Sequence, residues 1–145
     1  MAATWIQPIH TSSSKSIIRT YEDSINYILN PEKTEGGRYV YGYNVAPETA
    51  VDSFTLSRHA YAQKTGRKIK DTSLHGDDRE VLMYHLRQSF APGEVTPEQA
   101  LEISKKLALE FTKGEHQFII ACHTDQEHIH CHIICAPIRG ESKSA

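Results

Sequence analysis

Two short apolar runs with a polar turn between them place the strongest constraint on the fold of this 145-residue chain. The runs are Gln117–Cys122 and Ile129–Ile134, and both have the length and residue types of β-strands. Because the polar segment between them is short, the two strands are predicted to pair as an antiparallel hairpin.

Four histidines lie in a stretch of ten residues within this hairpin, from residue 123 to residue 132. Side chains alternate between the two faces of a strand, so His128, His130 and His132 are predicted to share one face. Folding of the hairpin then brings His123, on the first strand, beside the His130/His132 pair. Neutral imidazole is the commonest metal ligand in proteins. The pattern therefore favours a metal site formed by His123, His130 and His132 over a set of exposed strand histidines.

The sequence His123-Thr-Asp125, followed by His130-Cys-His132 and an apolar strand, resembles the three-histidine motif of conjugative relaxases. The motif is similar to that of the P-type mobilisation (MobA/MobL-like) family, which belongs to the HUH endonucleases. In that superfamily the histidines hold a divalent cation against the scissile phosphate of single-stranded DNA. Many relatives have Asn four residues after the last histidine, where this chain has Ala136.

The resemblance implies a complete function. The chain would perform metal-dependent, tyrosine-mediated, site- and strand-specific nicking and rejoining of single-stranded DNA at a transfer origin. Such nicking initiates mobilisation of a plasmid or conjugative element. The implied cofactor is a divalent metal ion, Mg²⁺ or Mn²⁺, and the implied partners are single-stranded DNA and accessory relaxosome proteins.

A helical stripe of apolar residues distinguishes two tyrosines in the segment from Ser16 to Asn30. Tyr21 lies in the middle of the stripe and is expected to be buried. At about 100° per residue, Tyr27 lies roughly 120° away from Tyr21 and is predicted to be accessible. From the residues alone, Tyr27 is an ordinary partly exposed tyrosine. In the resembled family the nucleophilic tyrosine lies in a similar segment, which implies that Tyr27 is the nucleophile.

Two polar residues near the histidines have open roles. Asp125 is expected either to orient a ligand imidazole or to help take the proton of the tyrosine. His128 is the surplus histidine and is expected to be exposed or to face a phosphate.

The net charge of −2 does not suggest nucleic-acid binding, which usually requires a basic domain. Locally, however, there is a basic patch formed by Lys64, Arg67, Lys68 and Lys70. A solvated loop is the default interpretation of this patch, and contact with DNA phosphates is the alternative. The resemblance adds Ser89, because a serine at the end of the corresponding strand contacts DNA near the scissile phosphate.

Three tyrosines, Tyr39, Tyr41 and Tyr43, fall on one side of the segment Gly36–Asn44. An edge hairpin or loop is the simpler interpretation of this segment. The alternative is a platform on which unpaired bases stack.

The remaining patterns predict a strand at Thr4–His10, a helix at Pro47–Thr65, a strand at Glu80–Phe90 and a helix from Thr96 to Lys113. A capping box begins the last of these helices. Its predicted buried stripe consists of Ala100, Ile103, Leu107 and Phe111. This order predicts an α+β fold: a two-layer HUH-type domain with one antiparallel sheet and helices packed on it.

Composition sets the remaining bounds. The chain is 39% hydrophobic and 23% charged, which is ordinary for a soluble globular protein, and residues 1–145 fit one domain. Relaxase domains are usually longer, so the chain is compatible with an N-terminal fragment of a relaxase. It has no run of membrane-spanning length and no signal peptide, and a cytoplasmic location is expected.

Three cysteines, Cys122, Cys131 and Cys135, lie on the hairpin, and their odd number argues against a disulfide framework. Buried thiols are predicted, with zinc ligation as the alternative.

Two other function classes stay open. In a metal-dependent hydrolase the metal would activate water, and Tyr27 would be a bystander. In a metal-stabilised single-stranded-DNA-binding module, DNA would bind without being cut. Nicking that survives Tyr27→Phe would identify the first class, and binding without cleavage the second.

Overall fold

The computed structural model describes residues 3–10, 14–66 and 81–137. In chain order its elements are β1 (Ala3–His10), α1 (Ile17–Ile28), β2 (Val40–Tyr43), a short 3₁₀ helix (Pro47–Thr49), α2 (Ala50–Thr65), β3 (Val81–Ser89), α3 (Pro97–Thr112), β4 (Phe118–His123) and β5 (His130–Cys135). This order confirms the predicted succession of elements. None of the helices in these ranges is long and apolar enough to cross a lipid bilayer.

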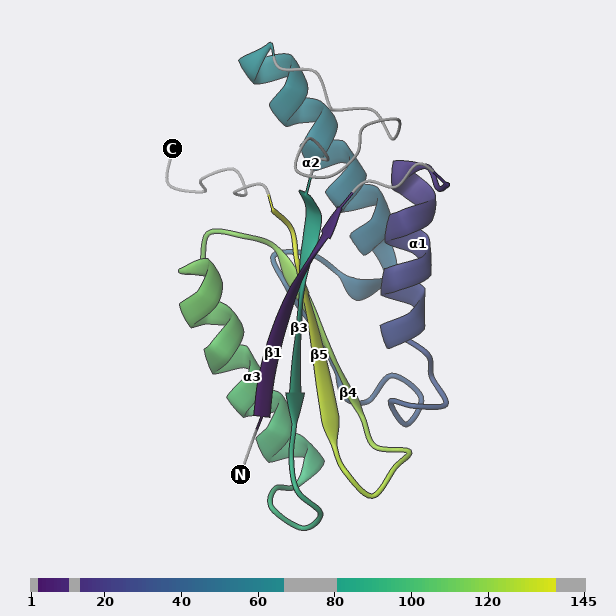
Figure 1. Cartoon of the computed structure of the whole chain (residues 1–145), viewed down its shortest axis with the longest axis vertical. Helices are drawn as coiled ribbons and strands as arrows, with labels where there is room; N and C mark the ends of the chain where they lie inside the picture. Colours follow the sequence, from purple (N-terminus) through teal and green to yellow (C-terminus); the bar gives the residue numbers. More distant parts are fainter. Residues whose placement is uncertain (1–2, 11–13, 67–80, 138–145) are drawn as a thin grey trace.

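One antiparallel sheet contains the five described strands, in the order β1-β3-β5-β4-β2. The predicted hairpin, β4–β5, therefore lies inside the sheet, with β3 on one side and β2 on the other. Helices α1 and α2 lie on one side of the sheet, and α3 lies on the opposite side (Figure 1). The predicted α+β class with one antiparallel sheet and helices packed on it is confirmed. Because helices cover both faces, the sheet is the middle of three layers (Figure 1), whereas two layers were predicted.

Each face of the sheet has its own hydrophobic core. Ile119 and Ala121 of β4 belong to the core under α1 and α2, whereas Phe118 and Ile120 belong to the core under α3. This assignment follows the alternation of side chains along a strand. Because both faces are covered, every residue of β4 is buried.

Helix α1 is fixed to the sheet through Tyr21. Its ring makes an edge contact with Phe54 of α2, with 5.8 Å between the ring centroids. Its hydroxyl donates a hydrogen bond of 2.9 Å to the carbonyl of Leu82 in β3. Burial raises the pKa of Tyr21 to about 12, so the phenol stays protonated. The predicted core position of Tyr21 is confirmed.

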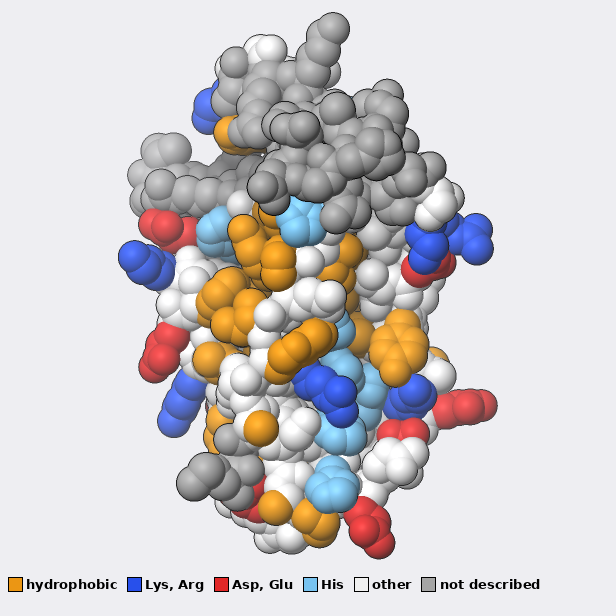
Figure 2. Space-filling view, viewed as in Figure 1, with side chains coloured by type: hydrophobic (Ala, Val, Ile, Leu, Met, Phe, Trp, Pro, Cys, Tyr) orange, Lys and Arg blue, Asp and Glu red, His pale blue; other side chains and the backbone are white. Residues whose placement is uncertain are grey.

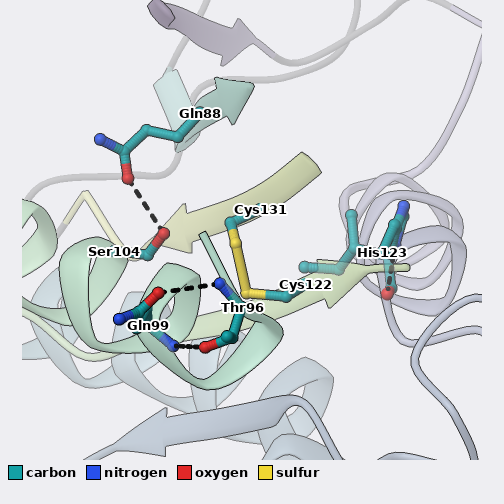
Figure 3. The surroundings of a disulfide bond; sticks show 8 residues. Gln88, Thr96, Gln99, Ser104, Cys122, His123 and Cys131 are labelled. Carbon is teal, nitrogen blue, oxygen red and sulfur yellow. Dashed lines mark hydrogen bonds between the residues drawn. A yellow bond between two sulfur atoms is a disulfide. The ribbon is translucent and has the colours of Figure 1, made fainter. Parts of the chain in front are cut away.

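Helix α3 begins as predicted, but its buried face differs from the predicted stripe. Thr96 and Gln99 form the capping box, which is visible in Figure 3. The buried residues are Ala100, Ser104, Ala108 and Thr112. Ile103 and Phe111 are exposed, so the prediction that they are buried was wrong.

The reason lies in the contact between α3 and the sheet. The buried positions carry small side chains, which allow the helix to lie close to β4 and β5. Ser104 also donates a hydrogen bond of 3.0 Å to the side-chain oxygen of Gln88 in β3 (Figure 3). A stripe chosen by hydrophobicity alone misses a polar pair of this kind.

The cysteine prediction was wrong for two of the three residues. Cys122 and Cys131 form a disulfide, and only Cys135 is a buried thiol. The two bonded cysteines are directly opposite each other in the hairpin, with their Cα atoms 4.0 Å apart. The strand register, rather than the number of cysteines, brings the sulfur atoms together. Burial raises the pKa of the Cys135 thiol to about 12.

The segment with three tyrosines ends in the edge strand β2. Tyr39 is buried in the core under α3, and the Tyr43 ring stacks on Phe118 with 4.7 Å between centroids. Tyr41 packs against the same core. These contacts favour the simpler edge-strand interpretation, because the rings lie on the face of the sheet that carries α3.

Candidate active site

The register of the β4–β5 hairpin places the three predicted ligand histidines on one face. His123 is directly opposite His130, and His132 is opposite Ala121, which belongs to the core under α1 and α2. The rings of His123 and His132 are in contact, with 4.5 Å between their centroids. Figure 3 shows His123 on the side of the hairpin away from the disulfide.

Tyr27 lies over this pair of histidines. It occupies the last turn of α1, and it is 56% exposed. Its ring centroid is 6.2 Å from that of His123 and 6.3 Å from that of His132, both in edge geometry. The Nζ atom of Lys33 lies 4.6 Å from the centroid of the Tyr27 ring. The structure therefore brings the predicted tyrosine and two of the predicted histidines together.

A fourth histidine, His85 of β3, was missed as a site residue from the sequence. Its Nε2 atom lies 2.9 Å from Nδ1 of His132. One of these nitrogens must carry the shared proton. If His132 binds a metal through Nε2, its Nδ1 carries the proton and donates it to His85. The alternation of β3 places His85 on the same face as Arg87 and Ser89, but nothing local shows that β3 lies beside β5.

The orientation of His123 is fixed by the backbone of α1. Its Nε2 atom lies 2.9 Å from the carbonyl oxygen of Ile28. A carbonyl can only accept, so Nε2 carries the proton and donates it. In the neutral ring this leaves Nδ1 of His123 with a lone pair.

Burial lowers the pKa of the four histidines in this cluster, which are His85, His123, His130 and His132. The effect is largest for His132, whose pKa falls to about 3. The positive charge of Arg87 lowers each of these pKa values further, while the carboxylate of Asp125 partly offsets this for His123 and His130. The imidazoles are therefore neutral at pH 7 and can act as ligands.

Three further predicted residues border the cluster. Ser89 is directly opposite His130 on the neighbouring strand. Asp125 and His128 are exposed in the β4–β5 turn, and the His128 ring stacks with that of His130 at 6.3 Å between centroids. Histidine side chains run along the middle of this face, with basic side chains beside them (Figure 2).

Only one residue of the predicted basic patch, Lys64, lies within the described residues, and it is not at this site. Lys64 is in the last turn of α2, at the end of that helix far from the β4–β5 turn (Figure 1). Arg67, Lys68 and Lys70 lie outside the described residues. Arg87, which sequence reasoning did not select, is the exposed cation next to the histidines.

The donor set suits a divalent cation. Within residues 3–10, 14–66 and 81–137, no three His, Cys, Asp or Glu side chains are already arranged around one ion. However, His123 and His132 are in contact, and His130 is the direct strand partner of His123. All three rings are neutral at pH 7 and offer a lone pair. His130 is half-buried on the same face as His123 and His132, so three neutral imidazoles share this face of the hairpin.

Comparison with known proteins identifies the family. Residues 27–145 match the MobA/VirD2-like relaxase nuclease domain. The chain is 38% identical over 120 residues to the group II intron-interrupted relaxase LtrB of Lactococcus lactis subsp. cremoris, covering 74% of the chain and 21% of LtrB. It is 45% identical over 131 residues to protein rlx of Staphylococcus aureus, covering 90% of the chain and 32% of rlx.

The chain therefore belongs to the MobA/VirD2-like relaxase nuclease family, as its histidine motif predicted. It spans 21% of LtrB and 32% of rlx.

Proposed function

We propose that this chain is the DNA-nicking domain of a relaxase, acting on single-stranded DNA at a transfer origin with Tyr27 as nucleophile. The observation that carries the proposal is the position of Tyr27. It is an exposed tyrosine whose ring lies 6.2 Å and 6.3 Å, between centroids, from two neutral buried histidines. Accessory relaxosome proteins are part of the same proposal.

We assign the binding of a divalent cation, Mg²⁺ or Mn²⁺, to His123, His130 and His132. When bound, this ion supplies neutralisation of the charge on a non-bridging phosphate oxygen. The hydrogen bonds of the neighbouring residues select the nitrogens that can bind. The carbonyl of Ile28 leaves Nδ1 of His123 for the metal. We assign the shared proton to Nδ1 of His132 with His85 as its acceptor, which leaves Nε2 of His132 for the metal.

In the chemical step, the Tyr27 hydroxyl oxygen attacks the phosphorus atom and forms a phosphotyrosine at the 5′ end. The bond from phosphorus to the 3′ oxygen breaks, and the departing oxygen takes a proton to become a 3′-hydroxyl. The proton of Tyr27 passes to a base, for which Asp125 in the adjacent turn is the candidate. The ammonium group of Lys33, beside the tyrosine ring, offers a positive charge to the phosphate.

The test is the formation of a covalent adduct. Wild-type protein with Mn²⁺ and candidate-origin oligonucleotides should give a protein–DNA band on a denaturing gel, and EDTA should abolish it. Mass spectrometry of the digested adduct should find the nucleotide on Tyr27. Tyr27→Phe should form no adduct. The control is Tyr61→Phe, which changes an exposed tyrosine on a different helix, α2, and should form the adduct normally.

Three results would contradict this proposal. An adduct on another tyrosine would move the nucleophile. Nicking that persists in Tyr27→Phe would indicate a hydrolase that uses metal-activated water. Binding of single-stranded DNA without cleavage, at any candidate origin and with either metal, would indicate a DNA-binding module without catalytic activity.

A further inference from the structure

A row of three side chains crosses the sheet next to the candidate site. Trp5 of β1 is directly opposite Arg87 of β3, and Arg87 is directly opposite His132 of β5. Directly opposite residues in an antiparallel sheet point to the same face. Trp5 and Arg87 therefore lie on the face that carries the histidines. With neighbouring strands about 4.8 Å apart, Trp5 is roughly 10 Å from His132 at the backbone.

Trp5 has an unusual environment for a tryptophan. It is 50% exposed on the edge strand of the sheet, although tryptophan is highly buried on average. Its ring makes an edge contact with His85, with 5.9 Å between centroids. His85 in turn is hydrogen-bonded to His132. The exposed indole is thus connected to the candidate metal ligands through one residue.

Arg87 places a positive charge directly beside the candidate site of a chain whose net charge is −2. It is exposed, and among the described residues no carboxylate forms an ion pair with it. The positive charge of Arg87 acts on all four site histidines and lowers the pKa of each. A planar guanidinium with several donors is well suited to a phosphate group.

We propose that Trp5 and Arg87 form a binding subsite for a nucleotide adjacent to the scissile phosphate. Arg87 binds a backbone phosphate, and Trp5 stacks on an unpaired base. The subsite deepens the proposed function and rests on it, since its ligand is the same single-stranded DNA. Proteins that bind single strands combine these two elements, a basic group along the backbone and an aromatic ring under the base.

The sequence provides its own probe, because Trp5 is the single tryptophan of the chain. Binding of a single-stranded oligothymidylate should quench the intrinsic tryptophan fluorescence. The quenching should saturate at the same DNA concentration as the anisotropy of a labelled oligonucleotide. Such an oligonucleotide contains no transfer origin, so cleavage does not interfere.

Substitutions separate the two roles. Trp5→Leu should weaken binding roughly 5- to 150-fold without changing its salt dependence, whereas Trp5→Phe should keep most of the wild-type affinity. Arg87→Gln should reduce the slope of log K against log salt by about 0.7. Ile6→Ser is the matched control, because Ile6 is 48% exposed on the same strand and points to the opposite face. It should leave both quantities unchanged.

The outcomes distinguish the subsite from the function on which it rests. DNA binding by anisotropy with unchanged tryptophan fluorescence would overturn the subsite and leave the nicking proposal standing. An equal loss of affinity in Ile6→Ser and Trp5→Leu would overturn it as well, because the effect would then come from the strand. Failure of the wild-type protein to bind or cut any single-stranded DNA would defeat both proposals.

Discussion

Replacement of His85 by leucine tests how the candidate metal site is held. The Nε2 atom of His85 lies 2.9 Å from Nδ1 of His132, and His132 is only 6% exposed. Leucine removes the acceptor, so a metal on Nε2 forces the His132 proton onto Nδ1, where it is buried without a partner, whereas the metal-free ring can carry its proton on Nε2. An unsatisfied buried donor costs about 1–3 kcal/mol. Because about 1.4 kcal/mol corresponds to a factor of ten, metal affinity should fall roughly 5- to 150-fold.

The matched control is His85→Gln. The side-chain oxygen of glutamine can lie near the position of Nε2 of histidine and can accept the same hydrogen bond. Metal affinity in His85→Gln should therefore stay within about threefold of the wild-type value, well inside the tenfold that about 1.4 kcal/mol represents. The difference between the two variants isolates the hydrogen bond from the change in packing.

The measurement is isothermal titration of each variant with Mn²⁺ in the absence of DNA. Thermal unfolding should accompany it, to show that both variants fold. Proton–nitrogen NMR of the metal-free wild-type protein should find the His132 proton on Nδ1. Equal affinities for wild type and His85→Leu, or a His132 proton on Nε2, would refute the reasoning.

Three other outcomes are expected. His130→Ala should abolish metal-dependent nicking without changing the circular dichroism spectrum, because the strand ladder does not require the imidazole; residual nicking would exclude His130 as a ligand. Tyr21→Ala should lower the free energy of unfolding in urea by about 3 kcal/mol or more, whereas Tyr27→Phe should change it by less than about 0.5 kcal/mol. The pKa of His132 is lowered to about 3 in the folded protein, so below pH 6.5 only the unfolded chain gains its proton. As the pH is lowered from 6.5 to 3, the free energy of unfolding of the metal-free protein should therefore fall by up to about 1.4 kcal/mol per pH unit. His132→Leu should flatten this dependence on pH.

Local rules were sufficient for the hairpin and for the choice between the tyrosines. Alternation along β5 and a short turn place His123, His130 and His132 on one face, and helical phase separates Tyr21 from Tyr27. Both rules act over a few residues. They hold here because the hairpin and the helix are each stabilised by a continuous apolar surface.

The missed residues depend on contacts between distant segments. His85 and His132 are 47 residues apart in the chain, and they meet only because β3 pairs with β5. The row from Trp5 to Arg87 likewise requires β1 to pair with β3. No periodicity within a strand shows which strand lies beside it, so these residues became visible only with the sheet order.

The disulfide of the hairpin has a consequence for the unfolded protein. Cys122 and Cys131 are nine residues apart, and the loop that they close contains His123 and His130. A covalent bond persists when the chain unfolds, so the oxidised unfolded chain keeps these imidazoles in a small ring with His132 next to it. We expect such a ring to bind a divalent ion more readily than the open reduced chain does, because the disulfide limits the distance between the imidazoles. A ligand that also binds the unfolded chain stabilises the fold less. Added Mn²⁺ should therefore raise the melting temperature of the reduced protein more than that of the oxidised protein.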